Sequence, residues 1–238
     1  MTEVIPAILE GSFKEFAHKL HEIRGGAGTV QIDVCDGVLV SSVTWPYLSP
    51  VSPETALNYE ENFQELQRYE ADMPFWEEFN FELDLMVSNP EWLLPDLMIM
   101  GPSKIILHAA SFENIFAEVS EIKTMVPSIV EVAIAITPDA DPEILFPLID
   151  DGVVSSVQCM GIARIGHQGE PFDERVLSHL RTLREKYPEL PLSVDGGVNM
   201  DTAVKLKEAG ATHLVVGSAI WESDTPKNRI KDFQDLVY

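Results

Sequence analysis

The chain has 238 residues, of which 45% are hydrophobic, as expected for one globular α/β domain. Its 39 acidic and 16 basic residues give a formal net charge of −23, and such a surface repels nucleic-acid phosphates and anionic membranes. We therefore expect neither nucleic acid nor membrane as a partner, and any anionic ligand requires strong local donors.

Apolar runs rich in Val and Ile recur along the chain, and segments of helical periodicity follow them. Continuous apolar runs are typical of strands buried on both faces of a parallel sheet. In chain order we predict strands over Val4–Leu9, Val30–Val34, Phe81–Val87, Lys104–His108, Val130–Thr137, Ser155–Met160, Leu192–Val194 and His213–Val216.

The first helix signal follows the first strand, where Ser12 is a good N-cap for apolar residues at positions 13, 16, 20 and 23. A long irregular segment, from Gly37 to about Asn58, follows the second strand and could be an active-site loop. Further helices are predicted over Phe112–Met125, Asp173–Tyr187, Asp201–Ala209 and Pro226–Val237.

The strict alternation of strands and helices indicates how the sheet is arranged. No linker or composition shift interrupts the chain, so we predict one domain, residues 1–238, that closes into a (β/α)8 TIM barrel. A doubly wound open sheet is the alternative. Its G-x-G-x-x-G fingerprint is absent after the first strand, where Glu10-Gly11-Ser12 stands instead.

The cysteines and the N-terminal sequence indicate the cellular compartment in which we expect the protein. Cys35 and Cys159 form no C-x-x-C pair, which favours reduced thiols over a disulfide framework. The N-terminus lacks the basic and apolar regions of a signal peptide, and no apolar run has the length of a membrane span. We therefore expect a cytoplasmic protein.

Three acidic residues, Asp33, Asp84 and Asp195, lie in or directly after apolar strands. A buried carboxylate is costly unless it is paired, hydrogen-bonded or metal-bound. Each one alone is also compatible with a loop cap. Three at the C-terminal ends of barrel strands, where active sites lie, indicate proton transfer beside a carbonyl group or a divalent-cation site.

Glycines follow the last two predicted strands, as Gly196-Gly197 and as Gly217-Ser218. Loops at these two positions commonly bind phosphate in barrels, because glycine lets backbone N–H groups approach the oxygens closely. Tight turns that need a positive φ are the alternative explanation. We predict a phosphate site here.

The segment from Gly161 to Gly169, after the sixth strand, is predicted to be a lid. It carries Arg164, whose guanidinium or neighbouring amides could clamp a phosphate, although a solvated loop charge explains Arg164 equally well. We expect His108 and His167 to be structural or to contact substrate, because neither has a second histidine at metal-ligand spacing.

Several short motifs occur together along nearly the whole chain. They are Pro6-Ala7-Ile8-Leu9, Ile32-Asp33-Val34-Cys35-Asp36-Gly37, Leu83-Asp84-Leu85-Met86-Val87-Ser88-Asn89-Pro90, Lys104-Ile105-Ile106-Leu107-His108-Ala109-Ala110, Ile136-Thr137-Pro138, Val194-Asp195-Gly196-Gly197-Val198 and Gly217-Ser218-Ala219-Ile220. Together these motifs make the chain resemble the ribulose-phosphate 3-epimerase family.

The resemblance implies a phosphate-binding barrel that inverts C3 of a ketopentose 5-phosphate. Asp33 and Asp195 match two carboxylates on opposite faces of the substrate, one removing the proton and the other returning it, with a divalent metal stabilising the enediolate. The phosphate would lie on the loops at Gly166, Gly196, Gly197, Gly217 and Ser218, and Met86 would contact the substrate.

The chain departs from the family pattern at the metal shell and the lid. Gln31 and Asp84 stand where the family has histidine ligands, Ala7 replaces a serine, Cys35 replaces a methionine, and the lid from Met160 to Gln168 differs. Asp33, Asp84, Asp195 and Gln31 offer oxygen ligands, which suit magnesium or manganese better than zinc. Without a metal the carboxylates would repel one another, and one pKa would rise.

Three functions remain open from the sequence. The first is an isomerase or epimerase of a small phosphorylated sugar, with the changed lid and metal shell selecting a substrate other than the usual pentose phosphate. The second is a non-catalytic sugar-phosphate-binding homologue. A related lyase or decarboxylase ranks last, because Phe81–Val87 lacks the lysine typical of those barrels. Relatives often form oligomers, so a homo-oligomer is also an open alternative.

Overall fold

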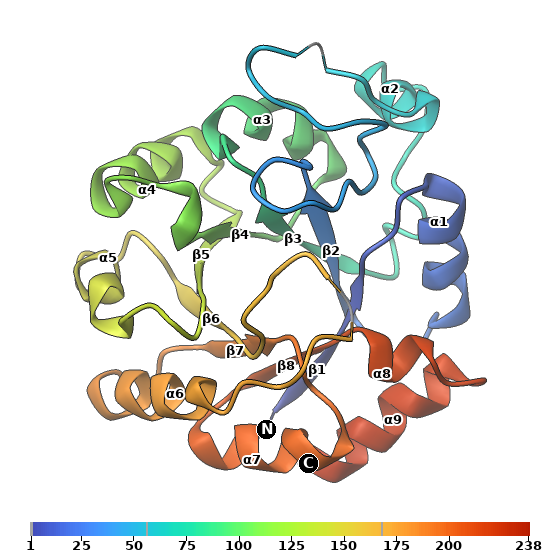
Figure 1. Cartoon of the computed structure of the whole chain (residues 1–238). Coiled ribbons are helices and arrows are strands. Elements are labelled where there is room, and N and C mark those ends of the chain that lie inside the picture. The colour runs from blue at the N-terminus through green and yellow to red at the C-terminus, as the bar shows by residue number, and fades with distance from the viewer. Residues whose placement is uncertain (1, 56, 168) are drawn as a thin grey trace.

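A closed barrel of parallel strands forms the centre of the molecule in the computed structural model, which describes residues 2–55, 57–167 and 169–238 (Figure 1). Each strand pairs with its sequence neighbours, and β8 pairs with β1. This confirms the predicted (β/α)8 barrel. The strands are β1 (Glu3–Ile8), β2 (Thr29–Cys35), β3 (Asn80–Met86), β4 (Lys104–His108), β5 (Glu131–Ile136), β6 (Ser156–Met160), β7 (Leu192–Asp195) and β8 (His213–Val216).

Helices surround the barrel (Figure 1). They are α1 (Phe13–Glu22), α2 (Glu61–Gln67), α3 (Pro90–Leu97), α4 (Ile115–Met125), α5 (Phe146–Asp150), α6 (Arg175–Lys186), α7 (Met200–Ala209), α8 (Ser218–Trp221) and α9 (Pro226–Val237), with short 3-10 turns at Met98–Met100, Ala109–Ser111 and Pro142–Leu145. None of these helices is long and apolar enough to cross a membrane.

Two predicted helices start later than their sequence patterns indicate, because local side chains fix the first turn. The helix predicted from Phe112 begins at Ile115, since the Asn114 side chain accepts the N–H of Ala117 and acts as N-cap. The helix predicted from Asp173 begins at Arg175, whose backbone N–H donates to the Asp173 carboxylate.

The interior of the barrel contains several polar side chains, whereas the layer between barrel and helices is apolar. Leu83, Val132 and Val157 are fully buried in that outer layer. Gln31, Asp84 and Gln158 are equally buried, but their hydrogen bonds run across the barrel interior. Barrel interiors are usually filled by branched apolar residues, so this polar filling indicates a functional end of the barrel.

The long segment after β2 is fixed over the ends of β2 and β3. Thr44 accepts the N–H of Cys35 at 2.9 Å and donates to the Asp33 carbonyl at 2.7 Å. Asp36 accepts the backbone N–H groups of Val38, Leu39 and Ser88. These bonds hold the segment above the strand ends that carry the acidic residues.

An aromatic stack fastens the same segment to the helices. The buried Trp45 ring stacks on Phe16 of α1 with a centroid distance of 4.9 Å, and meets Phe63 of α2 edge-on at 5.8 Å. Its Nε1 donates to Asn62 at 3.0 Å. Trp45 is therefore a large apolar anchor of the segment.

Replacing Trp45 by alanine should destabilise the protein by about 3–5 kcal/mol, because it leaves a large cavity between α1 and α2. Urea unfolding measures this loss. Trp76→Ala is the matched control, since Trp76 is 58% exposed, and it should change the free energy of unfolding by less than about 1 kcal/mol. Equal losses in the two variants would contradict the anchoring role.

Candidate active site

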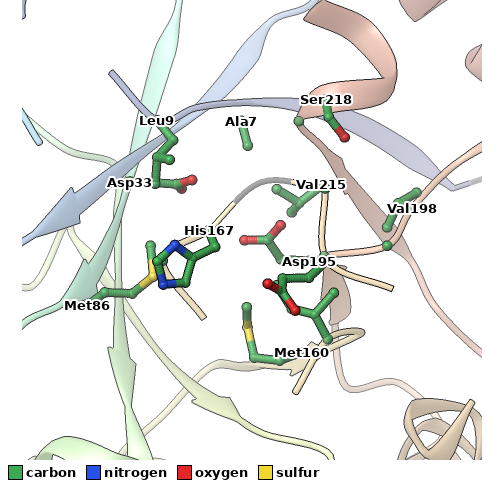
Figure 2. A pocket seen from close by; sticks show the side chains of 17 residues that line it. Ala7, Leu9, Asp33, Met86, Met160, His167, Asp195, Val198, Val215 and Ser218 are labelled. Carbon is green, nitrogen blue, oxygen red and sulfur yellow. The ribbon is translucent and has the colours of Figure 1, made fainter. Parts of the chain in front are cut away.

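A pocket opens at the C-terminal ends of the strands (Figure 2). It brings together most of the residues that the sequence predicted for catalysis and for substrate binding. Those that line it are Asp33, Met86, Gly166, Gly196, Gly197, Asp195, Gly217 and Ser218. Their convergence follows from the parallel barrel, in which the C-terminal ends of all strands meet at one face.

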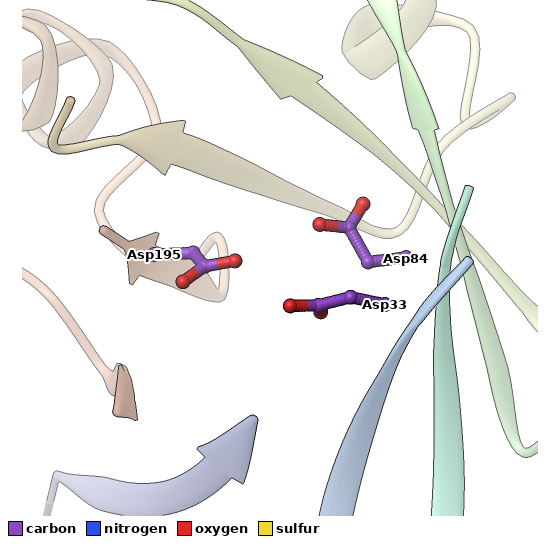
Figure 3. Close-up of side chains that lie close together, drawn as sticks. All are labelled: Asp33, Asp84 and Asp195. Atoms are coloured by element: carbon purple, nitrogen blue, oxygen red, sulfur yellow. The ribbon is translucent and has the colours of Figure 1, made fainter. Parts of the chain in front are cut away.

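Three carboxylates converge at the C-terminal ends of the strands (Figure 3), and two of them, Asp33 and Asp195, line the pocket. Asp33 and Asp84 are register partners on the neighbouring strands β2 and β3, and Asp195 reaches toward them from the end of β7. One oxygen from each lies within 4.8 Å of the others. Asp33 and Asp84 are buried and Asp195 is partly buried, so the negative charges are weakly screened.

The side-chain amide of Gln31 bridges two of the carboxylates. Its Nε2 donates to Asp33 Oδ1 at 2.8 Å and to Asp195 Oδ2 at 2.9 Å. Its Oε1 is buried and has no hydrogen-bond partner among the described residues. Gln31 therefore presents donors to the carboxylates, and a rotation of the amide would present the oxygen that the sequence analysis proposed as a metal ligand.

A second series of side-chain hydrogen bonds holds Asp84 in place. Its Oδ1 lies 2.7 Å from Nε2 of the buried His108, and its Oδ2 accepts from Gln158 Nε2 at 3.3 Å. Ser193 in turn donates to Gln158 Oε1 at 3.2 Å. His108 thus contacts a carboxylate and does not line the pocket.

Burial and mutual repulsion raise the pKa of the two bridged carboxyl groups. Burial is the largest cause for Asp33, whose pKa rises well above its ordinary value, and the charges of Asp195 and Asp84 add to it. Burial, followed by repulsion from Asp84, raises the pKa of Asp195 to about 7, against the opposing hydrogen bond from Gln31. Near neutral pH the metal-free pair therefore combines a carboxylic acid with a carboxylate.

The glycines after β7 leave no room for side chains. Gly196 and Gly197 have φ values of +91° and +67°, a region that favours glycine. A Cβ at Gly196 would lie 2.6 Å from Ile162, and one at Gly197 would lie 2.9 Å from Phe172. The turn therefore exposes backbone to the pocket beside Gly217 and Ser218, which follow the neighbouring strand β8.

The segment after β6 lies over the barrel mouth, where it is gold in Figure 1. Gly166 and His167 of this segment line the pocket. Arg164 does not: its side chain is 74% exposed, and its guanidinium pairs with Glu170. The structure thus does not bring Arg164 to the glycine turns. Gln168, which belongs to the predicted lid, lies outside the described residues.

Gly161 and Gln158 are functional candidates that sequence reasoning missed. The Gly161 N–H donates to the Asp195 carbonyl at 2.7 Å, and a Cβ at Gly161 would overlap the Gly196 carbonyl oxygen. Gln158 was visible in the sequence as an amide inside an apolar run, but nothing local indicated that its partner would be Asp84.

Gly161→Ala should destabilise the protein by about 1–3 kcal/mol, because the new methyl group forces the turns after β6 and β7 apart. Gly28→Ala is the matched control, since a Cβ there meets no atom within 4 Å. Urea unfolding of both variants tests the contact. A Gly161→Ala protein as stable as the control would show that the turns separate freely.

Asp195→Asn should stabilise the metal-free protein above about pH 7. The folded-state pKa is raised from 3.8 to about 7, so the folded protein retains a proton that the unfolded chain releases, and stability falls as pH rises through this window. The advantage of the variant should shrink by about 1.4 kcal/mol per pH unit as the pH falls below 7. Urea unfolding in chelator, with the exposed Asp235→Asn as control, measures it. An advantage that is independent of pH would refute the raised pKa.

Comparisons with known proteins identify the family and the fold. Residues 3–221 match the model of the Ribulose-phosphate 3 epimerase family. Two curated relatives are the ribulose-phosphate 3-epimerases of Eremothecium gossypii, 27% identical with 98% of this chain and 92% of the relative covered, and of Bacillus subtilis, 26% identical with 98% and 99% covered.

Solved structures that share the fold include KGPDC from Streptococcus mutans, with a TM-score of 0.68, 14% identity and 99% and 97% of the two chains covered. A 3-hexulose-6-phosphate synthase superposes with a TM-score of 0.67 at 14% identity, and both chains are fully covered (100%). At this identity the likeness extends to the fold alone. The family match covers most of the chain, and the protein belongs to the ribulose-phosphate 3-epimerase family.

Proposed function

We propose that this protein is an epimerase or isomerase of a phosphorylated sugar, which moves a proton through an enediolate. The observation that carries the proposal is the pairing of Asp33 and Asp195 across the pocket by a single amide, at 2.8 and 2.9 Å. Family membership supports the same reaction class, since the curated relatives are named ribulose-phosphate 3-epimerases.

The two carboxyl groups would act as a base and an acid. The ionised carboxylate accepts the proton from the carbon next to the sugar carbonyl, and the C–H electron pair moves into the enediolate. The protonated carboxyl group then donates its proton to the opposite face of the same carbon. The product has the inverted configuration, and exchange with water restores the starting protonation. The raised pKa of Asp195, about 7, suits both roles near neutral pH.

Glycine turns would hold the phosphate. Gly196, Gly197 and Gly217 line the pocket without side chains. The Gly196 N–H bonds the Asp195 carboxyl group, so the N–H groups of Gly197 and Gly217 would be the local donors that an anion needs on a protein with a net charge of −23. The phosphate would thus lie on the side of β7 and β8, and the sugar would extend from there over Asp195 toward Asp33.

The cluster of three carboxylates fits a hard divalent cation. Asp33, Asp84 and Asp195 each offer an oxygen, and the buried, unpartnered Oε1 of Gln31 supplies a fourth after rotation of the amide. Oxygen ligands favour magnesium or manganese over zinc. When bound, such a cation would neutralise the negative charge of the enediolate.

The reaction should be visible as solvent deuterium entering a ketose phosphate. We expect incorporation with at least one member of a ketose-phosphate panel in the presence of magnesium or manganese, and loss of incorporation with chelator. Asp33→Asn and Asp195→Asn should each slow exchange by roughly 10²–10⁴-fold, because each removes one proton-transfer group.

The exposed Asp235→Asn is the matched control and should exchange at the wild-type rate. No incorporation with any sugar, with magnesium, manganese or zinc supplied, would refute the proposed reaction. Calorimetric binding of a sugar phosphate without exchange would instead identify a non-catalytic homologue.

A further inference from the structure

The walls of the pocket carry little positive charge. Its lining includes the carboxyl groups of Asp33, Asp195 and Glu170, and His167 is the lining side chain, among the described residues, that can carry a positive charge or donate an imidazole N–H. A sugar phosphate bound here therefore meets the glycine turns at one end, but few donors elsewhere.

Contacts between two loops hold His167 at the pocket. Its Nε2 lies 3.2 Å from the Ser41 hydroxyl, and Ser42 donates to the Gly166 carbonyl at 2.5 Å. A Cβ at Gly166 would lie 2.7 Å from Val40, so this close approach depends on glycine. The segment after β2 and the segment after β6 are thus joined at three adjacent positions.

The position of the joined loops places His167 away from the glycine turns that follow β7 and β8. Ile165 packs on Cys35, Val40 and Met86, over the ends of β2 and β3, whereas the glycine turns follow β7 and β8. In the view of Figure 2, His167 is drawn on the side of the pocket where Met86 lies and away from Ser218. His167 therefore lies toward the end of the pocket that receives the part of the ligand farthest from its phosphate.

We propose that His167 is a specificity-determining residue, which hydrogen-bonds the hydroxyl groups at the end of the sugar farthest from the phosphate. The assignment rests on the proposed sugar-phosphate function. Ser41 holds Nε2, so Nδ1 is the ring nitrogen offered to the ligand. A polar group positioned in this way favours substrates that satisfy it and discriminates against those that are too short or lack the hydroxyl.

Calorimetry with two probes tests the assignment. The probes are a ketopentose 5-phosphate and inorganic phosphate, each titrated into wild type, His167→Ala and His167→Asn. His167→Ala should weaken binding of the ketopentose phosphate by about fivefold to tenfold, the effect of one hydrogen bond, and change phosphate binding by less than about twofold. His167→Asn, which retains a polar group near the Nδ1 position, should recover part of the loss.

His18→Ala is the matched control, because His18 on α1 has a side chain that is 70% exposed, and it should bind both probes as wild type does. A merely structural role, in which the lid collapses without His167, would weaken both probes equally. Equal losses, or no loss for either probe, would overturn the assignment.

This test separates the assignment from the proposed reaction, because binding requires no turnover. A wild-type protein that binds the ketopentose phosphate but exchanges no deuterium refutes the reaction, and the variants still decide the role of His167. Normal exchange with unchanged binding in His167→Ala refutes only the role of His167. A wild-type protein that binds no ketopentose phosphate overturns the role of His167, whereas deuterium exchange across the ketose-phosphate panel decides the reaction separately.

Discussion

The repulsion among three carboxylates at one end of the barrel is the constraint on which the site depends. Asp33, Asp84 and Asp195 lie within 4.8 Å of one another, on a protein whose net charge is already −23. Such a group is stable only with protons, donors or a cation among its members. The Gln31 amide and the raised pKa of Asp195 meet this need in the metal-free protein, and the same features provide an acid beside a base.

His108, Gln158 and Ser193 support this cluster. His108 and Gln158 fix Asp84 from both of its oxygens, and Ser193 fixes Gln158. Gln31 and Asp84, where the family resemblance leads one to expect histidine ligands, therefore belong to an organised network of hydrogen bonds. Their oxygen atoms would suit a hard cation better than zinc. The loops above the cluster bring one imidazole to a pocket in which the other ionisable lining residues, Asp33, Glu170 and Asp195, are acidic.

Much of the fold was predictable, because buried parallel strands are continuous apolar runs and their C-terminal ends must meet. That reasoning also found Asp33, Asp84 and Asp195, since each carboxylate interrupts or ends such a run. It could not find the bond between Gly161 and Asp195, or the pairing of Gln158 with Asp84, because these depend on barrel register between distant segments.

The position of the Arg164 side chain was not predictable either, because the loop geometry directs it to Glu170 and solvent. Helix starts differed where Asn114 and Asp173 bind the first turn.

The central claim is that the carboxylate cluster holds a proton where a cation can replace it. Calorimetric titration of the chelator-treated protein with magnesium or manganese, in buffers of different ionisation enthalpy, counts the protons released on binding. Because burial and mutual repulsion raise the pKa of both Asp33 and Asp195, the latter to about 7, binding should release at least one proton per site near pH 6 and fewer protons as the pH rises above about 7. Cation binding near pH 6 without proton release, or no cation binding at either pH, would contradict the account.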